Sequence, residues 1–249
     1  MYAAVPECFS KQYFESGRVI FSVPVSEFAA LGSSGDKKRA FIGLLRLATK
    51  QSDFIFTSRL RISVDIFQST YLRIKNPNAY DIDNLGKPIL DALSGCEGLF
   101  VDDSLIERVI INWIDSLEQR IEVEIDAPFP SFQLKSEVAY VRGGSWCFPF
   151  WKPLLAEHRD SLPGNIAAIR RFFDVWNSIR SDEDFEEKQS LLPIGTFVAS
   201  NKLRDRGFDL YDLDCLVEEC MSMQNSVEAA SASHNIKIQK TGLERPGIA

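Results

Sequence analysis

The run from Arg59 to Phe67 constrains the fold more than any other part of the sequence. Apolar and polar residues alternate along it, and this period of two is typical of a β-strand with one buried face. Its apolar positions are Leu60, Ile62, Val64 and Ile66. Because a strand with one apolar face needs partner strands and a covering layer, we expect a sheet with helices packed on it.

Flanking segments predict the rest of this domain. Val19–Val25 is rich in β-branched and aromatic residues and predicts a strand. Asp36 predicts the N-cap of a helix over residues 37–49. Val109–Ile114 and Arg120–Ile125 predict two further strands joined by a polar turn, which suggests a hairpin that closes the sheet. The expected order β-α-β-α-β-β defines an α/β or α+β domain over residues 1–127.

An acidic stretch after the alternating strand carries the residues that indicate chemistry. Asp81-Ile-Asp-Asn-Leu-Gly-Lys87 combines two aspartates with a lysine, and Asp102-Asp103 follows an apolar run. In an extended segment, Asp81 and Asp83 would point to the same side. Clustered carboxylates repel one another unless a cation intervenes, and Mg²⁺ prefers such oxygen ligands. Lys87, one helical turn after Asp83, would stabilise charge on a phosphoryl group.

The same residues also have structural interpretations. Asp83 and Asn84 are good helix N-cap residues, and Asp102-Asp103 could simply open a turn. Pro88 fits the first turn of a helix, which predicts a helix start close to Lys87. Asp91, one turn further, either orients Lys87 or forms a plain surface pair with it.

Taken together, the segments Asp81-Ile-Asp-Asn-Leu-Gly-Lys-Pro-Ile-Leu-Asp-Ala-Leu93 and Gly98-Leu-Phe-Val-Asp-Asp-Ser-Leu-Ile106 resemble the signature of the RusA family of Holliday junction resolvases. The resemblance covers about Val19 to Asp126. It implies an endodeoxyribonuclease that cuts four-way junctions in recombination and repair as a homodimer on branched DNA. It also implies Mg²⁺, with Mn²⁺ as a substitute, held by Asp81, Asp83 and Asp103. The catalytic residues would be these three and Lys87, with Asp91, Asp102 and Asn84 as supporting neighbours.

The charge balance limits how this protein could grip DNA. A net charge of −7 argues against a broad basic face, because many phosphate contacts need many cations. We therefore expect only local contacts with DNA. The basic trio at residues 37–39 either contacts phosphate or is simply the solvated first turn of a helix. The candidate contacts are Lys37, Lys38, Arg39, Arg73 and Lys75. Two histidines and scattered cysteines supply a zinc site poorly.

The resemblance ends near Pro128-Phe-Pro130, and the rest reads as a separate, mainly helical accessory region over residues 128–225. Asn165 predicts the cap of a helix that runs to Ile179, Ser181 predicts another cap, and Tyr211–Met223 predicts a last helix. The cluster Trp146, Phe148, Phe150 and Trp151 favours a core anchor over a base-stacking platform. Residues 226–249 predict a disordered tail.

Two alternatives to a junction endonuclease stay open: a metal-dependent nucleotide phosphohydrolase and a catalytically inactive DNA- or protein-binding module. The accessory region could supply positive surface or recruit a protein partner. Its basic residues include Arg170, Arg171, Lys202, Arg204 and Arg206. No stretch approaches the roughly 18 apolar residues of a membrane span, and no secretory segment is recognisable. We therefore expect a cytoplasmic protein with no membrane partner.

Overall fold

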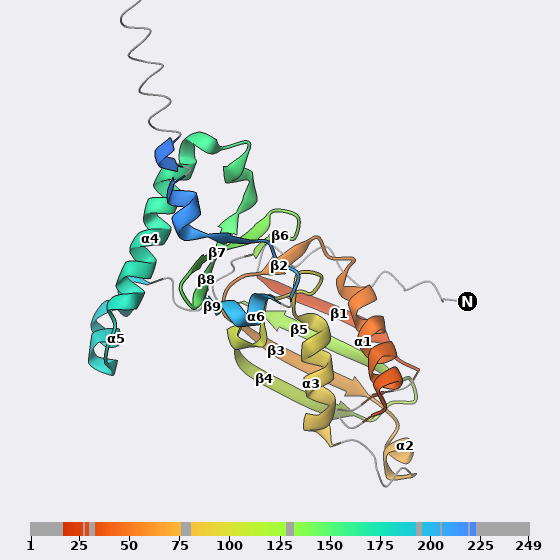
Figure 1. Ribbon diagram of the computed structural model, residues 1–249. Coiled ribbons are helices and arrows are strands. Elements are labelled where there is room, and N and C mark those ends of the chain that lie inside the picture. Colours follow the sequence, from red (N-terminus) through yellow and green to blue (C-terminus); the bar gives the residue numbers. More distant parts are fainter. Residues whose placement is uncertain are drawn as a thin grey trace, which may run out of the picture.

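The computed structural model describes residues 17–222 apart from 27, 30–32, 76–80, 128–131, 193–195, 205 and 219. The predicted tail at 226–249 lies outside this part of the chain. The described part of the chain has two halves, before and after residue 128, and each half contains a four-stranded sheet (Figure 1). The predicted mixed α/β class is confirmed.

The first sheet is mixed, with the strand order β1-β5-β3-β4. It is built from β1 (Arg18–Pro24), β3 (Leu60–Phe67), β4 (Ile106–Ile114) and β5 (Arg120–Asp126). β3 pairs in parallel with β4 and antiparallel with β5. The predicted strands are therefore confirmed, but the hairpin between the last two is wrong. β3, the most regularly alternating strand, takes the place between them, so both of its edges are paired.

Two helices cover one face of this sheet, α1 (Gly35–Thr49) and α3 (Ile82–Leu93) (Figure 1). Their apolar sides meet the alternating residues of β3 in one hydrophobic cluster, which explains why burial along β3 follows the predicted period. Asp36 lies inside the first turn of α1 and not at the cap. The cap is Ser34, because the Lys38 amide already donates to the Ser34 carbonyl at 3.0 Å.

The second half contains helices, as expected, and also a second sheet that its helical patterns did not indicate. The order of this sheet is β10-β7-β8-β9. Its strands are β7 (Val138–Gly143), β8 (Trp146–Trp151), β9 (Val198–Ala199) and β10 (Leu210–Asp212). The aromatic run at 146–151 forms β8, and Phe150 is buried in a cluster with the main helix of this half. Trp146 and Phe148 pack against the same cluster, which supports the core-anchor interpretation for these three residues, whereas Trp151 is 37% exposed.

The helices described in the second half include α4 (Leu162–Ser178), α5 (Asp182–Lys188) and α6 (Ser200–Arg204), and a last helix follows β10. α4 begins before Asn165, because Pro163 suits its first turn and Ser161 is the cap. The predicted cap at Ser181 is confirmed, since its side chain accepts a bond from the Asp184 amide. The last helix begins at residue 213, because residues 210–212 pair with β7.

The two halves share a hydrophobic cluster. Ile55, Val101 and Leu105 of the first half pack with Val138, Tyr140, Cys147, Val198 and Leu203 of the second. The short strand β2 (Phe54–Phe56) also pairs with β6 (Phe132–Leu134) across the boundary. The predicted boundary near residue 128 is therefore bridged by packing. Within the described residues, no helix combines the length and apolar character that a bilayer span requires.

Candidate active site

α3 carries most of the predicted site residues, and it begins five residues earlier than expected. Asp81 is its N-cap, and the amides of Asn84 and Leu85 both donate to the Asp81 carbonyl. The expected start near Lys87 is wrong because Pro88 lies within the helix and not in its first turn. Proline removes one helical hydrogen bond, but Pro88 is buried, so packing offsets part of that cost.

The earlier start changes how the aspartates are arranged. Asp83 lies in the first helical turn and not in an extended segment, so the alternation argument for Asp81 and Asp83 does not apply. Instead, Asp83, Lys87 and Asp91 are spaced four residues apart, along one side of α3. Gly86 lets this helix approach β4, because a Cβ atom there would lie 2.5 Å from Ile111 Cδ1.

Lys87 connects two parts of the motif. Its ammonium lies 2.8 Å from Asp103 Oδ2 and 3.0 Å from Asp91 Oδ1. The hydrogen bond to Asp103 has the largest effect and raises the pKa of Lys87; burial lowers that pKa, and the hydrogen bond and charge of Asp91 raise it again, so the net shift is upward. Lys87 is therefore held as a cation between two carboxylates.

The Asp102–Asp103 pair forms the turn that leads into β4. Asp102 is the N-cap of a short 3-10 helix, η2 (Asp103–Leu105), and its Oδ1 accepts a bond from the Ser104 amide at 3.0 Å. The two aspartates differ sharply in exposure: the Asp102 side chain is 0% exposed and that of Asp103 is 28% exposed. Asp102 therefore supports the turn, and Asp103 faces outward.

Asp103 is strongly stabilised in its charged form. Partial burial raises the pKa of Asp103, but the hydrogen bond from Lys87 and the charges of Lys87 and Lys202 outweigh it and lower that pKa to about 2. A carboxylate that stays ionised at neutral pH is a suitable metal ligand.

Two cations from the second half also reach this turn. Lys202 Nζ lies 3.4 Å from Asp103 Oδ1, and Arg206 Nη2 lies 3.2 Å from Asp102 Oδ2. The sequence had placed both only in a general positive surface. The sequence indicates Lys202 and Arg206 only indirectly: if Asp102 is buried, it needs a cationic partner.

Not all predicted ligands are brought together. Asp81 and Asp83 are exposed, and no ion pair of their side chains occurs in the described part of the chain. Among the described residues, no three acidic, histidine or cysteine side chains form a group that could hold a metal ion. The chemistry of the donor set, all carboxylate oxygens, nevertheless fits Mg²⁺.

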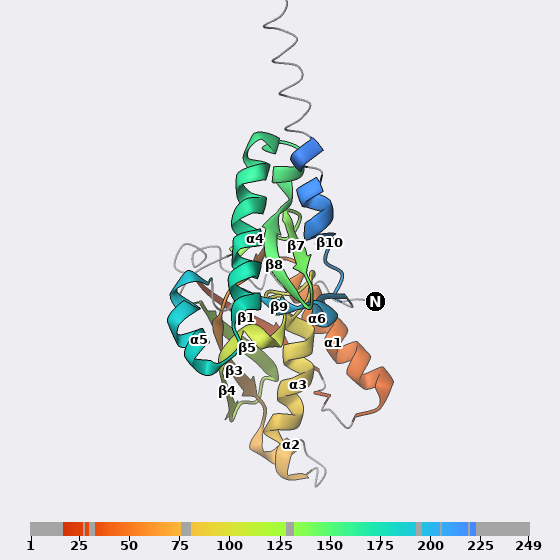
Figure 2. The same ribbon diagram turned by 60° about the vertical axis from the view of Figure 1, so that its left-hand side comes forward.

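The predicted DNA contacts lie in two places. Lys37, Lys38 and Arg39 are on the first turn of α1, where Arg39 pairs with Asp36. Arg73 and Lys75 are on α2 (Thr70–Lys75), near the start of α3 (Figure 2). Both stack on aromatic rings: Arg73 lies 5.1 Å from the Trp113 ring centre, and Lys75 lies 5.5 Å from that of Tyr71.

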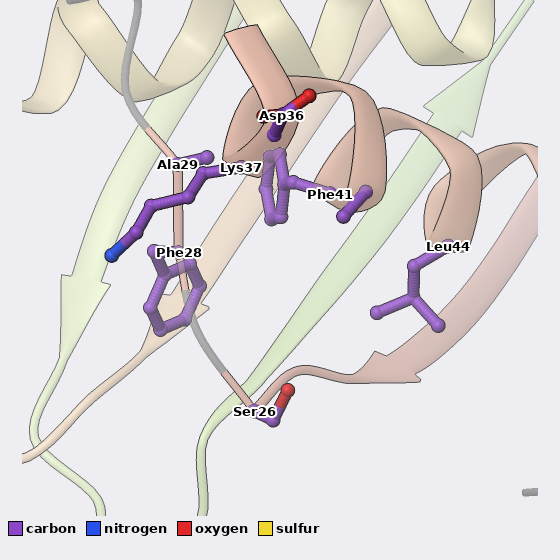
Figure 3. Close-up of a pocket in the computed structure, with 8 residues that line it drawn as sticks. Ser26, Phe28, Ala29, Asp36, Lys37, Phe41 and Leu44 are labelled. Atoms are coloured by element: carbon purple, nitrogen blue, oxygen red, sulfur yellow. The ribbon is translucent and has the colours of Figure 1, made fainter. Parts of the chain in front are cut away.

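A cavity of about 450 Å³ lies elsewhere, between α1 and the loop after β1 (Figure 3). Its lining is mainly apolar, and Lys37 extends along it beside Phe28. The lining residues are Ser26, Phe28, Ala29, Asp36, Lys37, Ala40, Phe41 and Leu44. None comes from α3 or from the Asp102–Asp103 turn, so this cavity is separate from the acidic site.

Comparison with protein-family models matches residues 38–126 to the family described as Endodeoxyribonuclease RusA. The match runs from α1 to the end of β5 and includes Asp81, Asp83, Lys87 and Asp103. Lys202 and Arg206 lie outside it. No curated protein matches the chain.

Proposed function

Because residues 38–126 match the model of the RusA endodeoxyribonuclease family, we propose that this protein is a Mg²⁺-dependent, structure-selective endonuclease that cleaves four-way DNA junctions. One observation carries the proposal: Lys87 on α3 and Asp103 before β4, both expected in the site, form a direct ion pair. Residues far apart in the motif thus converge on one place.

The metal would be held by Asp81, Asp83 and Asp103, with Mn²⁺ as a substitute for Mg²⁺. Mg²⁺ takes few protein carboxylates and completes its shell with waters and phosphate oxygens, which suits this small donor set. When bound, the ion supplies Lewis-acid polarisation of the phosphate and an activated water. Asp103 is already ionised for this role, since its pKa is about 2.

Lys87 would stabilise the negative charge that develops on the phosphate oxygens during cleavage. Asp91, 3.0 Å from its ammonium, would keep that ammonium oriented. Asp102 would act through the backbone, because its side chain holds the Ser104 amide and so fixes the turn that presents Asp103. Asn84, in the first turn of α3, is a further candidate neighbour of the metal ligands.

Cutting two strands of a junction needs two such sites, and the edge strand β4 suits a homodimer contact. β4 is the last strand of its sheet, so its outer backbone edge has no neighbour within that sheet. It also exposes apolar side chains, with Val109 41%, Ile110 37% and Ile114 37% exposed. Exposed apolar strand edges pair readily with another chain.

The test is incubation of the purified protein in Mg²⁺ with a four-way junction, a duplex, a flap and a single strand. We expect cleavage of the junction in preference to the others, and its loss in Asp103→Asn with junction binding kept. The control is Asp174→Asn, an exposed position on α4. If none of the DNA substrates is cut, the proposal fails; hydrolysis of nucleotides instead would favour a phosphohydrolase, and an absence of Mg²⁺ binding would favour an inactive binding module.

A further inference from the structure

The half of the chain that lies outside the family match delivers a cation to the candidate site. Lys202 on α6 lies 3.4 Å from Asp103 Oδ1 and 3.7 Å from Asp102 Oδ1. Figures 1 and 2 both place α6 beside one end of α3, where the two halves meet. Asp103 therefore faces two ammonium groups, Lys87 at one oxygen and Lys202 at the other.

The position of Lys202 is fixed by its neighbours in the chain. Leu203 is fully buried in the cluster shared by the two halves. The Arg206 carbonyl accepts a bond from the Cys96 amide at 3.0 Å, and the Arg206 guanidinium contacts Ser94 Oγ and Asp102 Oδ2. Gly207, at φ 80°, allows the close approach, since a Cβ there would lie 2.7 Å from Cys96 Sγ. The residues that directly follow Lys202 thus attach its segment to the core.

The two aspartates of this turn depend on Lys202 to different degrees. Asp102 is buried and satisfied by Arg206 and by the Ser104 amide, so it does not need Lys202. The Lys202 side chain remains 48% exposed, and its other partner is the carboxylate that the proposed function assigns to the metal. A cation bound to Asp103 would repel the Lys202 ammonium. That ammonium is then available to a phosphate oxygen, an ionised acceptor with which it forms a strong, charge-assisted hydrogen bond.

We propose that Lys202 is a further active-site cation, supplied by the accessory region, that contacts a DNA phosphate beside the scissile bond, and that Arg206 is the positioning residue that holds its segment against the Asp102–Asp103 turn. This inference rests on the proposed function. It makes the second half a part of the active site, while the family domain supplies the metal ligands and Lys87.

The experiment measures junction binding by the full chain across a range of NaCl concentrations, with Ca²⁺ in place of Mg²⁺. Lys202→Met should reduce the slope of log K against log salt by about 0.9, the value for one lost phosphate contact. Lys202→Arg should keep the wild-type slope, because a guanidinium also binds phosphate. The control is Lys188→Met on α5, which bonds to Ser178 and lies apart from α6 in both views, and its slope should stay at the wild-type value.

An unchanged slope in Lys202→Met, with wild-type folding by circular dichroism, would overturn the inference. The inference would also fail if Lys202→Met kept the wild-type salt slope but cleaved faster and bound Mg²⁺ more tightly. Lys202 would then only compete with the metal for Asp103. Lys202→Gln is measured in parallel, so that one poorly folded variant does not decide the result. If the wild-type chain binds no junction, the proposed function falls as well; if it binds and cleaves while the slope is unchanged, only the role of Lys202 is lost.

Discussion

The ammonium of Lys87 lies 2.8 Å from the Oδ2 atom of Asp103, so an ion pair joins α3 to the turn that begins β4. The two residues are 16 positions apart in the chain. The pair brings a carboxylate that is ionised at neutral pH and a cation to the same place at the surface. In the proposed mechanism Asp103 is a metal ligand and Lys87 stabilises charge on the phosphate.

Replacing Lys87 by Met should lower the rate of junction cleavage by about 100-fold or more, the typical cost of one lost charge-stabilising group. Junction binding should change little by comparison, because the interaction matters most in the transition state. Single-turnover cleavage and separate binding measurements distinguish the two effects. The control is Lys50→Met, which should cleave at the wild-type rate. It removes a lysine at the end of α1 that pairs with Glu97. Equal rates for Lys87→Met and the wild type would refute the assignment.

Gly98→Ala should destabilise the protein by roughly 1–3 kcal/mol or more, as for other overpacked sites. The new Cβ would lie 2.1 Å from the Leu93 carbonyl oxygen, a backbone atom that cannot rotate away as the end of a side chain could. Gly43→Ala is the matched control. It adds the same methyl group within α1 where nothing lies within 4 Å, so it should stabilise the helix by about 0.5–1 kcal/mol. Urea unfolding measures both changes. Equal stabilities for the two variants would contradict the geometry of the turn after α3.

Lys135 should make stability depend on pH in the alkaline range. Its ammonium donates to the carbonyls of Thr49 and Glu97, at 2.8 and 3.1 Å. Burial lowers the pKa of Lys135 to about 8, from 10.5 in an unfolded chain. Between these values the unfolded state binds more protons, so the free energy of unfolding should rise with pH. Below pH 8 both states are protonated and this contribution is flat.

The measurement is the difference in unfolding free energy between the wild type and Lys135→Met, followed from pH 7 to pH 10.5. This difference should grow in favour of the wild type above pH 8. Lys188→Met serves as the control and should show no such rise relative to the wild type. A constant or falling difference for Lys135→Met would show that Lys135 is not desolvated as described.

Ile110→Lys should separate a homodimer into monomers, because it places a charge on the exposed edge strand β4. The matched control is Leu191→Lys, which changes an apolar residue that is 59% exposed in the second half. Light scattering during gel filtration gives the mass of each variant. We expect a dimer for the wild type and the control, and a monomer for Ile110→Lys. A monomeric wild-type protein would contradict the proposed dimer.

Local sequence patterns predicted the elements of the first half well, because alternation and helical spacing report directly on which side chains are buried. β3 and α1 are the clearest cases. The hairpin predicted between β4 and β5 was wrong because strand order depends on distant partners: β3 lies between them. The start of α3 was predicted too late because proline prefers the first turn of a helix. Pro88 lies inside α3 instead, where its burial outweighs that preference.

The candidate site was also predicted only in part, because local patterns do not report on distant partners. Spacing within one motif indicated Lys87 and Asp91, and the family resemblance indicated Asp103; the structure places Lys87 in contact with both aspartates. Lys202 is 99 residues from Asp103, and no local pattern indicates which distant cation will meet a given carboxylate. Its place is set by the cluster that buries Leu203 with Val101 and Leu105.

The proposed function requires that Asp83 and its partner carboxylates bind a divalent ion without which junction DNA would not be cleaved. Single-turnover cleavage of a four-way junction, titrated with Mg²⁺, tests it most directly. We predict saturable, Mg²⁺-dependent cleavage by the wild type and by the control Asp174→Asn, and none by Asp83→Asn although it still binds the junction. Cleavage by Asp83→Asn at the wild-type rate and Mg²⁺ dependence would contradict the claim.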